Sequence, residues 1–188
     1  MRLISLSSLI FSAICAVSSP VAAEPTPVVV ELFTSQGCSS CPPADELVKR
    51  LSEREDILPL AFHVDYWDYI GWADIFADPA YTDRQRGYAQ VGGRNMIYTP
   101  QMIVMGREDV VGADVMEVSE VLGSYVGQKP KMHLTVARDS ETLAVRAPEL
   151  PDGMSGQFRV QLVRYMPLKR VEIKRGALAG NTVDYANI

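Results

Sequence analysis

The chain has 188 residues, enough for one ordinary domain with or without a small appendage. It carries 18 basic and 23 acidic side chains, a formal net charge of −5 at pH 7. An acidic chain without a basic cluster does not have the composition of a nucleic-acid-binding protein, which excludes that class.

Residues 1–23 have the pattern of a secretory signal peptide, "MRLISLSSLIFSAICAVSSPVAA". A basic residue precedes the apolar run Leu3–Val17, and small residues lead up to a cleavage site before Glu24. A retained membrane anchor is the less favoured alternative, because the run is shorter than the roughly 20 apolar residues of a spanning helix. We therefore expect export, to the periplasm in particular, and no membrane contact after cleavage.

Cleavage removes Cys15 and leaves Cys38 and Cys41 as the two cysteines of the mature chain. An exported protein meets an oxidising compartment, in which a cysteine pair can persist as a disulfide.

The first elements expected after the signal form a strand–helix–strand unit. "VVVELFT" (28–34) is a continuous apolar run, typical of a strand covered on both faces. After the turn residues "SQGCSSCPP", a helix begins near Pro42, with apolar residues at i, i+3, i+4 and i+7 from Ala44. "ILPLAFHVDYW" (57–67) predicts a second strand, so the order indicates a parallel crossover.

The next segments continue an α/β pattern. A helix is expected from Pro79 to Gly92, then strands in "YTPQMIVMG" (98–106) and "EDVVGAD" (108–114), then a helix in "ADVMEVSEVLGSYVG" (113–127). In the helix after Pro79 we expect Ala80, Tyr81 and Tyr88 to face inward and Asp83, Arg84 and Arg86 to face water.

After residue 129 the pattern changes to antiparallel strands with one buried face. "KMHLTVARD", "TLAVRAPEL", "QFRVQLVRYM" and "KRVEIKRG" alternate apolar and polar residues between turn-like segments. We expect an α/β domain over 24–128 and a β-rich C-terminal region over 129–188. The last strand, "TVDYANI", ends without a cap, which we interpret as an incomplete carboxyl end.

The spacing Cys-Ser-Ser-Cys at the start of a helix is typical of a redox pair. The nucleophile of disulfide exchange is the thiolate, and the free N–H groups of a helix N-terminus stabilise negative charge. We expect Cys38 to be the more exposed cysteine and to attack, and the more buried Cys41 to resolve the mixed disulfide. Ser39 and Ser40 are candidate hydrogen-bond donors to the thiolate.

These motifs resemble the thioredoxin superfamily. "VVVELF" with the cysteine pair resembles its central strand and active-site turn, and "YTPQMIVM" resembles its cis-proline loop. The resemblance implies that Pro100 follows a cis bond and that Thr99 faces the cysteines and offers backbone groups to a substrate. It also implies that Glu31 is near the place of a buried acid, which would relay a proton to Cys41. A strand-end carboxylate in water is an equally weighted interpretation of Glu31.

A closer resemblance covers residues 27–188. "VVELFTSQGCSSCPPAD", "FHVDYWDYIGW", "YTDRQRGYA" and "YTPQMIV" together are similar to a family of secreted bacterial proteins catalogued as domain of unknown function 1223. The resemblance implies a thioredoxin-like fold with an added antiparallel β-rich C-terminal extension, and export, and it implies no substrate.

The predicted function is a thiol–disulfide oxidoreductase without a cofactor, acting on a protein or small-thiol disulfide. One alternative is a Cu(I)-binding protein with Cys38, Cys41 and His63 as ligands, since thiolates select that ion. Another is an interaction protein whose disulfide is a local staple.

Three further features remain open. His63 and Asp65 share one side of a strand and are candidates to tune Cys38, with a packed histidine as the alternative. Tyr66 and Trp67 are candidates to wall a substrate groove, although packing is favoured for Trp67 and Trp72. Arg84 and Arg86 are candidates to bind a carboxylate, such as that of glutathione, although a solvated helix face is favoured.

Overall fold

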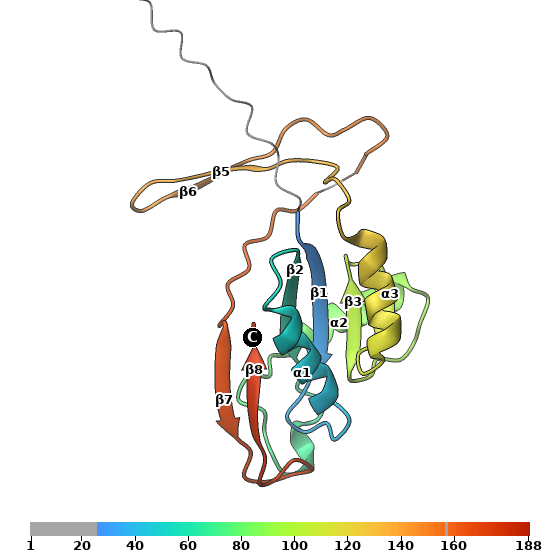
Figure 1. Ribbon diagram of the computed structural model, residues 1–188, viewed down its shortest axis with the longest axis vertical. Helices are drawn as coiled ribbons and strands as arrows, with labels where there is room; N and C mark the ends of the chain where they lie inside the picture. The colour runs from blue at the N-terminus through green and yellow to red at the C-terminus, as the bar shows by residue number, and fades with distance from the viewer. Residues whose placement is uncertain (1–25, 157) are drawn as a thin grey trace, which may run out of the picture.

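The central sheet has the strand order β2-β1-β3-β4 in the computed structural model, which describes residues 26–156 and 158–188 (Figure 1). Its strands are β1 (Val28–Thr34), β2 (Ile57–His63), β3 (Gln101–Val104) and β4 (Glu108–Val111). β1 and β2 are parallel, as the strand–helix–strand order predicts, whereas β3 is antiparallel to both β1 and β4. The predicted mixed α/β class is therefore confirmed.

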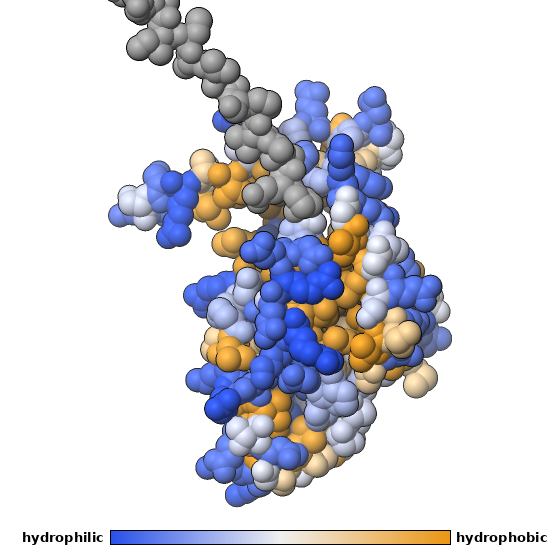
Figure 2. Space-filling view, viewed as in Figure 1, coloured by the Kyte–Doolittle hydropathy of each residue, from blue (hydrophilic) through white to orange (hydrophobic). Residues whose placement is uncertain are grey.

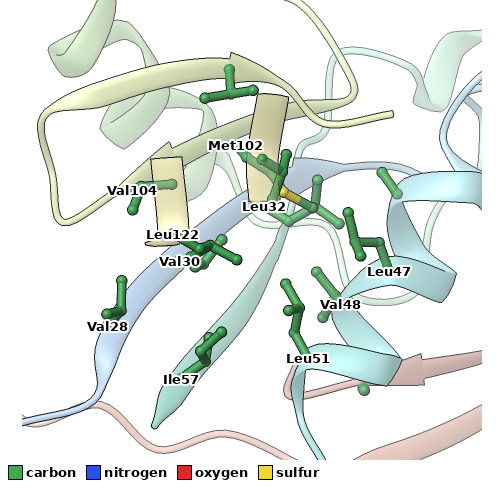
Figure 3. Packing of buried hydrophobic residues seen from close by; sticks show 14 residues of the cluster. Val28, Val30, Leu32, Leu47, Val48, Leu51, Ile57, Met102, Val104 and Leu122 are labelled. Atoms are coloured by element: carbon green, nitrogen blue, oxygen red, sulfur yellow. The ribbon is translucent and has the colours of Figure 1, made fainter. Parts of the chain in front are cut away.

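Helices cover both faces of this sheet, so the central strand β1 is buried on both sides. α1 (Pro42–Leu51) and α3 (Val115–Tyr125) pack on one face, and α2 (Pro79–Val91) packs on the other. Figure 3 shows the apolar side chains of α1, among them Val48 and Leu51, facing Val30 and Leu32 of β1. The apolar residues that recur with helical spacing after residue 42 thus form the buried face of α1, as predicted.

The inward face of α2 differs in part from the expected one. Tyr81 and Tyr88 pack on rings of the sheet as predicted. Thr82, Gln85 and Ala89 are the buried residues, while Ala80 is exposed. Arg84 does not face water alone, because its guanidinium binds a carboxylate on the sheet. α2 has a weak apolar stripe, so polar side chains with partners on the sheet decide which of its faces turns inward.

The C-terminal region forms two antiparallel pairs, β5 (Thr135–Arg138) with β6 (Leu143–Arg146) and β7 (Leu168–Glu172) with β8 (Thr182–Ala186). The buried face predicted for the first pair is wrong, because every residue of β5 and β6 is exposed. Figure 2 shows apolar side chains at the surface of this projecting hairpin. Two strands alone cannot cover an apolar face, and that face needs another layer against it.

The strand predicted within "QFRVQLVRYM" is absent over residues 158–166 of the described chain. The second pair behaves differently from the first, since Figure 1 shows β8 beside α1. Asn187 donates to the carbonyl of Pro59 at 2.8 Å, and Ala61 N–H donates to the carbonyl of Asn187 at 2.8 Å. These bonds bring Tyr185, which is 1% exposed, against β2 and α1.

The signal peptide predicted for residues 1–23 lies outside the described residues. Within 26–156 and 158–188, no helix combines the length and the apolar character needed to cross a bilayer.

Candidate functional site

Cys38 and Cys41 form a disulfide at the end of the turn between β1 and α1, with their Cα atoms 5.4 Å apart. Two backbone hydrogen bonds shape the turn, from Cys38 N–H to the Ser35 carbonyl at 3.1 Å and from Cys41 N–H to the Cys38 carbonyl at 3.3 Å. The sequence-predicted pair is therefore bonded within one tight turn.

The prediction that Cys38 is the exposed cysteine is wrong. Cys38 is 1% exposed and Cys41 is 0% exposed, while Ser39 and Ser40 occupy the outward positions of the turn. The chain segment that follows β2 packs on the two residues before Cys38, since Asp74 and Trp72 bind Gln36 and Trp67 contacts Gly37. Access to the sulfurs therefore requires a change in the side chains that cover them.

Fewer backbone N–H groups than expected are free at the start of α1 to stabilise a Cys38 thiolate. Cys41 caps α1, and the first two helical positions are prolines, which have no N–H. The next two amides donate to the Cys41 carbonyl. The hydroxyl of Ser40 lies 3.5 Å from Cys38 Sγ, so this side chain remains a donor to that sulfur, as expected from the sequence.

The Thr99–Pro100 bond is cis, as the resemblance predicts. The loop is tied to β4, since Gly112 N–H donates to the Pro100 carbonyl at 3.0 Å. It is also tied to the cysteine turn through Trp67, whose indole N–H donates to Thr99 Oγ1 at 2.8 Å. One indole thus spans the distance between the proline loop and the turn.

Trp67 lies directly over Gly37, the residue before Cys38. A β-carbon added at Gly37 would lie 2.9 Å from Trp67 Cβ and 3.2 Å from the Trp67 carbonyl oxygen. The expected packing role of Trp67 and Trp72 is therefore incomplete, because both indoles also donate hydrogen bonds within the site.

Replacement of Gly37 by alanine is expected to lower the free energy of unfolding by about 1–3 kcal/mol, because the new methyl group overpacks against backbone. The matched control is Gly87→Ala in α2, where a β-carbon meets nothing within 4 Å and where alanine should stabilise the helix by about 0.5–1 kcal/mol. Urea denaturation of both variants gives the two values. Equal stabilities for the two variants would contradict the close packing of Trp67 on Gly37.

Glu31 is buried, but it faces away from α1. Its carboxylate accepts from Arg84 Nε at 2.6 Å and Nη2 at 2.7 Å, and from the Tyr88 hydroxyl at 2.8 Å. Side chains alternate along a strand, so Glu31 projects to the α2 side while Leu32 joins the core beneath α1. The proton-relay role of Glu31 remains a prediction, and its ion pair borders a groove of about 620 Å³ on the sheet face beside α2.

Asp45 is a buried carboxyl on the cysteine side of the sheet that the sequence reasoning missed. It is 3% exposed, and its Oδ1 accepts the Thr34 hydroxyl at 2.7 Å while its Oδ2 has no partner among the described residues. Burial raises the pKa of Asp45 to about 7, against smaller opposing effects of His63 and the Thr34 hydrogen bond. The available signal was its position four residues after Cys41, which places both side chains on one helix face.

His63 lies in the same buried region. Its Nδ1 is 2.6 Å from Asp74 Oδ2, which also accepts the Gln36 N–H at 2.8 Å. The His63 ring packs edge-on against Tyr185, with ring centroids 4.9 Å apart. His63 Nε2 and the Tyr185 hydroxyl are buried without a partner among the described residues, which makes this an incompletely satisfied polar cluster.

Two predicted arrangements around the cysteines are not formed in the described part of the chain: Asp65 beside Cys38, and the metal-ligand set. Asp65 accepts the Thr82 hydroxyl at 2.5 Å and so pairs with α2. In residues 26–156 and 158–188, no group of three or more His, Cys, Asp or Glu side chains is arranged to hold a metal ion. The alternative ligand set of Cys38, Cys41 and His63 is therefore not assembled in this oxidised state.

Comparison with known proteins gives a family and one solved relative. The family described as "Protein of unknown function (DUF1223)" matches residues 29–188. The chain is similar to a protein from Agrobacterium tumefaciens with an X-ray crystal structure, at 34% sequence identity and a TM-score of 0.70. The match covers 88% of this chain and 71% of that chain. Among curated proteins, none matches the sequence.

Proposed function

We propose that this chain, which belongs to the DUF1223 family of proteins of unknown function, is a thiol–disulfide oxidoreductase that uses Cys38 and Cys41. The observation that carries the proposal is a disulfide formed between cysteines three residues apart, at the start of a helix and joined through one indole to a cis-proline loop. A disulfide in so short a loop closes few residues, so it adds less to stability than a long-range disulfide would.

The reaction is a balanced exchange of two thiols against one disulfide. A substrate thiolate attacks Cys38 Sγ, the bond to Cys41 breaks, and the electron pair leaves on Cys41 Sγ. A second substrate thiol, as its thiolate, attacks the substrate sulfur of the mixed disulfide and releases Cys38. The substrate is oxidised to a disulfide while the cysteine pair is reduced, and the same steps in reverse reduce a substrate disulfide.

The sulfur of Cys41 needs a proton partner, because a thiolate left in an apolar interior is costly. Asp45 supports this role better than Glu31, since both Glu31 oxygens are occupied by Arg84 and Tyr88. Asp45 is four residues from Cys41 on one helix face, and its Oδ2 is unoccupied among the described residues. We assign the exchange of the proton with Cys41 to Asp45.

The proposal includes a thioredoxin-like arrangement and export. A parallel β1–α1–β2 unit, a cis proline before β3 and an antiparallel β3–β4 pair support the arrangement. The signal-like segment at residues 1–23 supports export, and an oxidising compartment is where a Cys38–Cys41 disulfide persists. Thr99 and Pro100 would form the surface against which the substrate chain lies.

Reduction of insulin disulfides with dithiothreitol as the electron donor tests the function. The wild-type protein is expected to accelerate the reaction, and Cys38→Ser and Cys41→Ser are each expected to reduce it to the uncatalysed rate, since neither variant can cycle between dithiol and disulfide. The rate is measured as insulin turbidity against time. The urea midpoint of each variant is the control for folding.

A trapping experiment assigns the two sulfurs. Cys41→Ser is expected to accumulate a mixed disulfide between Cys38 and the substrate, which mass spectrometry detects, because no second thiol is left to resolve it. Ser39→Ala serves as the matched control in the same turn and should cycle without accumulating the adduct. Catalysis by both cysteine variants at the wild-type rate would show that the disulfide is only a structural staple.

A further inference from the structure

The segment between β2 and α2, residues 64–78, lies over the cysteine turn and is fastened to it at Gln36. The Gln36 N–H donates to Asp74 Oδ2 at 2.8 Å, and the Trp72 indole N–H donates to Gln36 Oε1 at 2.6 Å. Gln36 is 0% exposed and Asp74 is 5% exposed, so the bond between them is shielded from water, while Trp72 is half-buried. We call this segment the cover loop. Its distal part is firmly held, because one of the two bonds ends on a carboxylate.

In the proximal part of the cover loop, Val64 N–H donates to the Thr34 carbonyl at 2.9 Å and the Asp65 carboxylate accepts the Thr82 hydroxyl at 2.5 Å, whereas the Trp67 side chain is held by weaker contacts. Trp67 rests on Gly37, and its indole donates one neutral hydrogen bond to Thr99 Oγ1 at 2.8 Å. The Trp67 side chain is only half-buried, and it is followed by the exposed residues Tyr69 and Ile70. If the loop opens, the smallest loss of contacts is therefore at Trp67.

In the closed arrangement, the approach of an incoming thiol to the Cys38 sulfur is the limiting step. Attack on a disulfide requires the incoming sulfur to touch Cys38 Sγ, and Cys38 is 1% exposed. Trp67 runs from Gly37, the neighbour of Cys38, which its Cβ and carbonyl oxygen pack against, to Thr99, the residue before the cis proline, which its indole N–H binds. A thiol that approaches between the cysteine turn and the proline loop meets Trp67 first.

We propose that Trp67 is a positioning residue that gates the Cys38–Cys41 disulfide, and that its hydrogen bond to Thr99 Oγ1 is the contact that keeps the gate closed. The inference rests on the proposed function for its biological meaning, but the closure itself is a property of the folded chain. When the bond breaks, the indole turns away from Thr99 about the Trp67 Cβ, which stays on Gly37, and exposes Cys38. A cysteine-containing polypeptide segment is the substrate class that this opening admits, because Thr99 and Pro100 then offer a surface along which an extended chain can lie.

The rate at which excess dithiothreitol reduces the oxidised full-length protein tests the gate without any physiological substrate. Trp67→Phe keeps the Cβ and backbone contacts with Gly37 but lacks the N–H donor, and Thr99→Val keeps the shape but lacks the acceptor. Each variant is expected to be reduced about threefold to tenfold faster than wild type, which is the weight of one neutral hydrogen bond on the opening equilibrium. Tyr69→Phe, an exposed change in the same loop, is the matched control and should leave the rate unchanged.

The double variant Trp67→Phe/Thr99→Val makes the test specific. Both changes remove the same bond, so the double variant should be reduced no faster than the faster single variant. A double rate equal to the product of the two single effects, or single variants as slow as wild type, would overturn the gate. Tyr66→Phe, measured in the same series, checks the neighbouring hydroxyl and is expected to match wild type.

The outcomes for the gate and for the proposed function are separable. Faster reduction of the two single variants with no insulin reduction by any form supports the gate and removes the oxidoreductase. Insulin reduction that depends on Cys38 with identical dithiothreitol rates in all variants supports the oxidoreductase and removes the gate. Urea midpoints within the range of the Tyr69→Phe control exclude general unfolding as the cause of a faster rate.

Discussion

Arg84→Ala is expected to lower the free energy of unfolding by about 3 kcal/mol, because it leaves the Glu31 carboxylate buried without its cation. Arg84 makes a bidentate pair with Glu31, at 2.6 and 2.7 Å, and its guanidinium also lies 5.6 Å from the Phe62 ring centroid and 5.3 Å from that of Tyr88. The value is at the low end for buried pairs, since about one third of the Arg84 side chain is exposed while Glu31 is buried. Chemical denaturation at pH 7 measures the loss.

Arg86→Ala on the same helix is the matched control. Arg86 pairs with Asp83 at 2.9 Å, and both side chains are more than half exposed, so its loss should cost less than about 1 kcal/mol. The double variant Glu31→Gln/Arg84→Met is expected to recover part of the loss, because it leaves no buried charge unpaired. Equal effects of Arg84→Ala and Arg86→Ala would show that the Glu31 carboxylate is reached by water in solution.

Asp45→Asn is expected to change how stability depends on pH. The pKa of Asp45 is raised by burial from 3.8 to about 7, so between these pH values the folded chain keeps a proton that the unfolded chain has released. Stability falls with pH wherever the folded state binds more protons, so this group destabilises the fold progressively from about pH 4 to pH 7. The total is on the order of 4 kcal/mol, and it persists above pH 7. Asparagine cannot ionise, so the variant should be the more stable protein at pH 8.

The measurement is a urea titration of both proteins at pH 4.5 and pH 8. The stability difference between Asp45→Asn and wild type should grow with pH, and the wild-type protein should lose more stability than the variant between the two values. Glu46→Gln, an exposed change on the same helix, should follow the wild-type pH profile. A difference between Asp45→Asn and wild type that is the same at both pH values would mean that Asp45 titrates normally in the folded state.

The same titration bears on the proposed reaction. If Asp45 exchanges a proton with Cys41, Asp45→Asn should slow insulin reduction while leaving the Cys38–Cys41 disulfide able to form. If Asp45→Asn changed the stability but not the rate of insulin reduction, Asp45 would act in the fold alone. Water would then be the group that exchanges the proton with Cys41.

Local patterns account for the parts of this protein that the sequence predicts well. The run Val28–Thr34 and the periodicity after Pro42 each indicate their structure within a few neighbouring residues, whereas the cis bond before Pro100 was expected from the family resemblance. A buried strand must be apolar along its length, a packed helix must be apolar along one face, and a tight turn limits the residues it can hold. The cysteine pair belongs to this group, because a spacing of three brings both sulfurs within one turn.

Patterning was insufficient where the partner of a segment decides the outcome. β5 and β6 have the alternation of half-buried strands, yet all their residues are exposed, because alternation states which face is apolar and not what packs on it. Arg84 has the sequence context of a solvated helix residue, and only the alignment of α2 with β1 brings it to Glu31. β8 follows the cysteines by more than 130 residues, and nothing in its sequence indicates that Tyr185 packs on His63.

The sequence by itself determined the order of strands and helices over residues 28–125 and the position of the cysteine pair, since each depends on contacts between near neighbours in the chain, and the family resemblance added the cis proline. Only the tertiary structure decided that Cys38 is covered, that Trp67 joins Gly37 to Thr99, and that Asp45 rather than Glu31 lies on the cysteine side. The physical reason is that burial and the pKa of a carboxyl depend on the groups that surround it in space. Here those groups come from the turn after β1, the cover loop, the proline loop and β8, which are far apart in the chain.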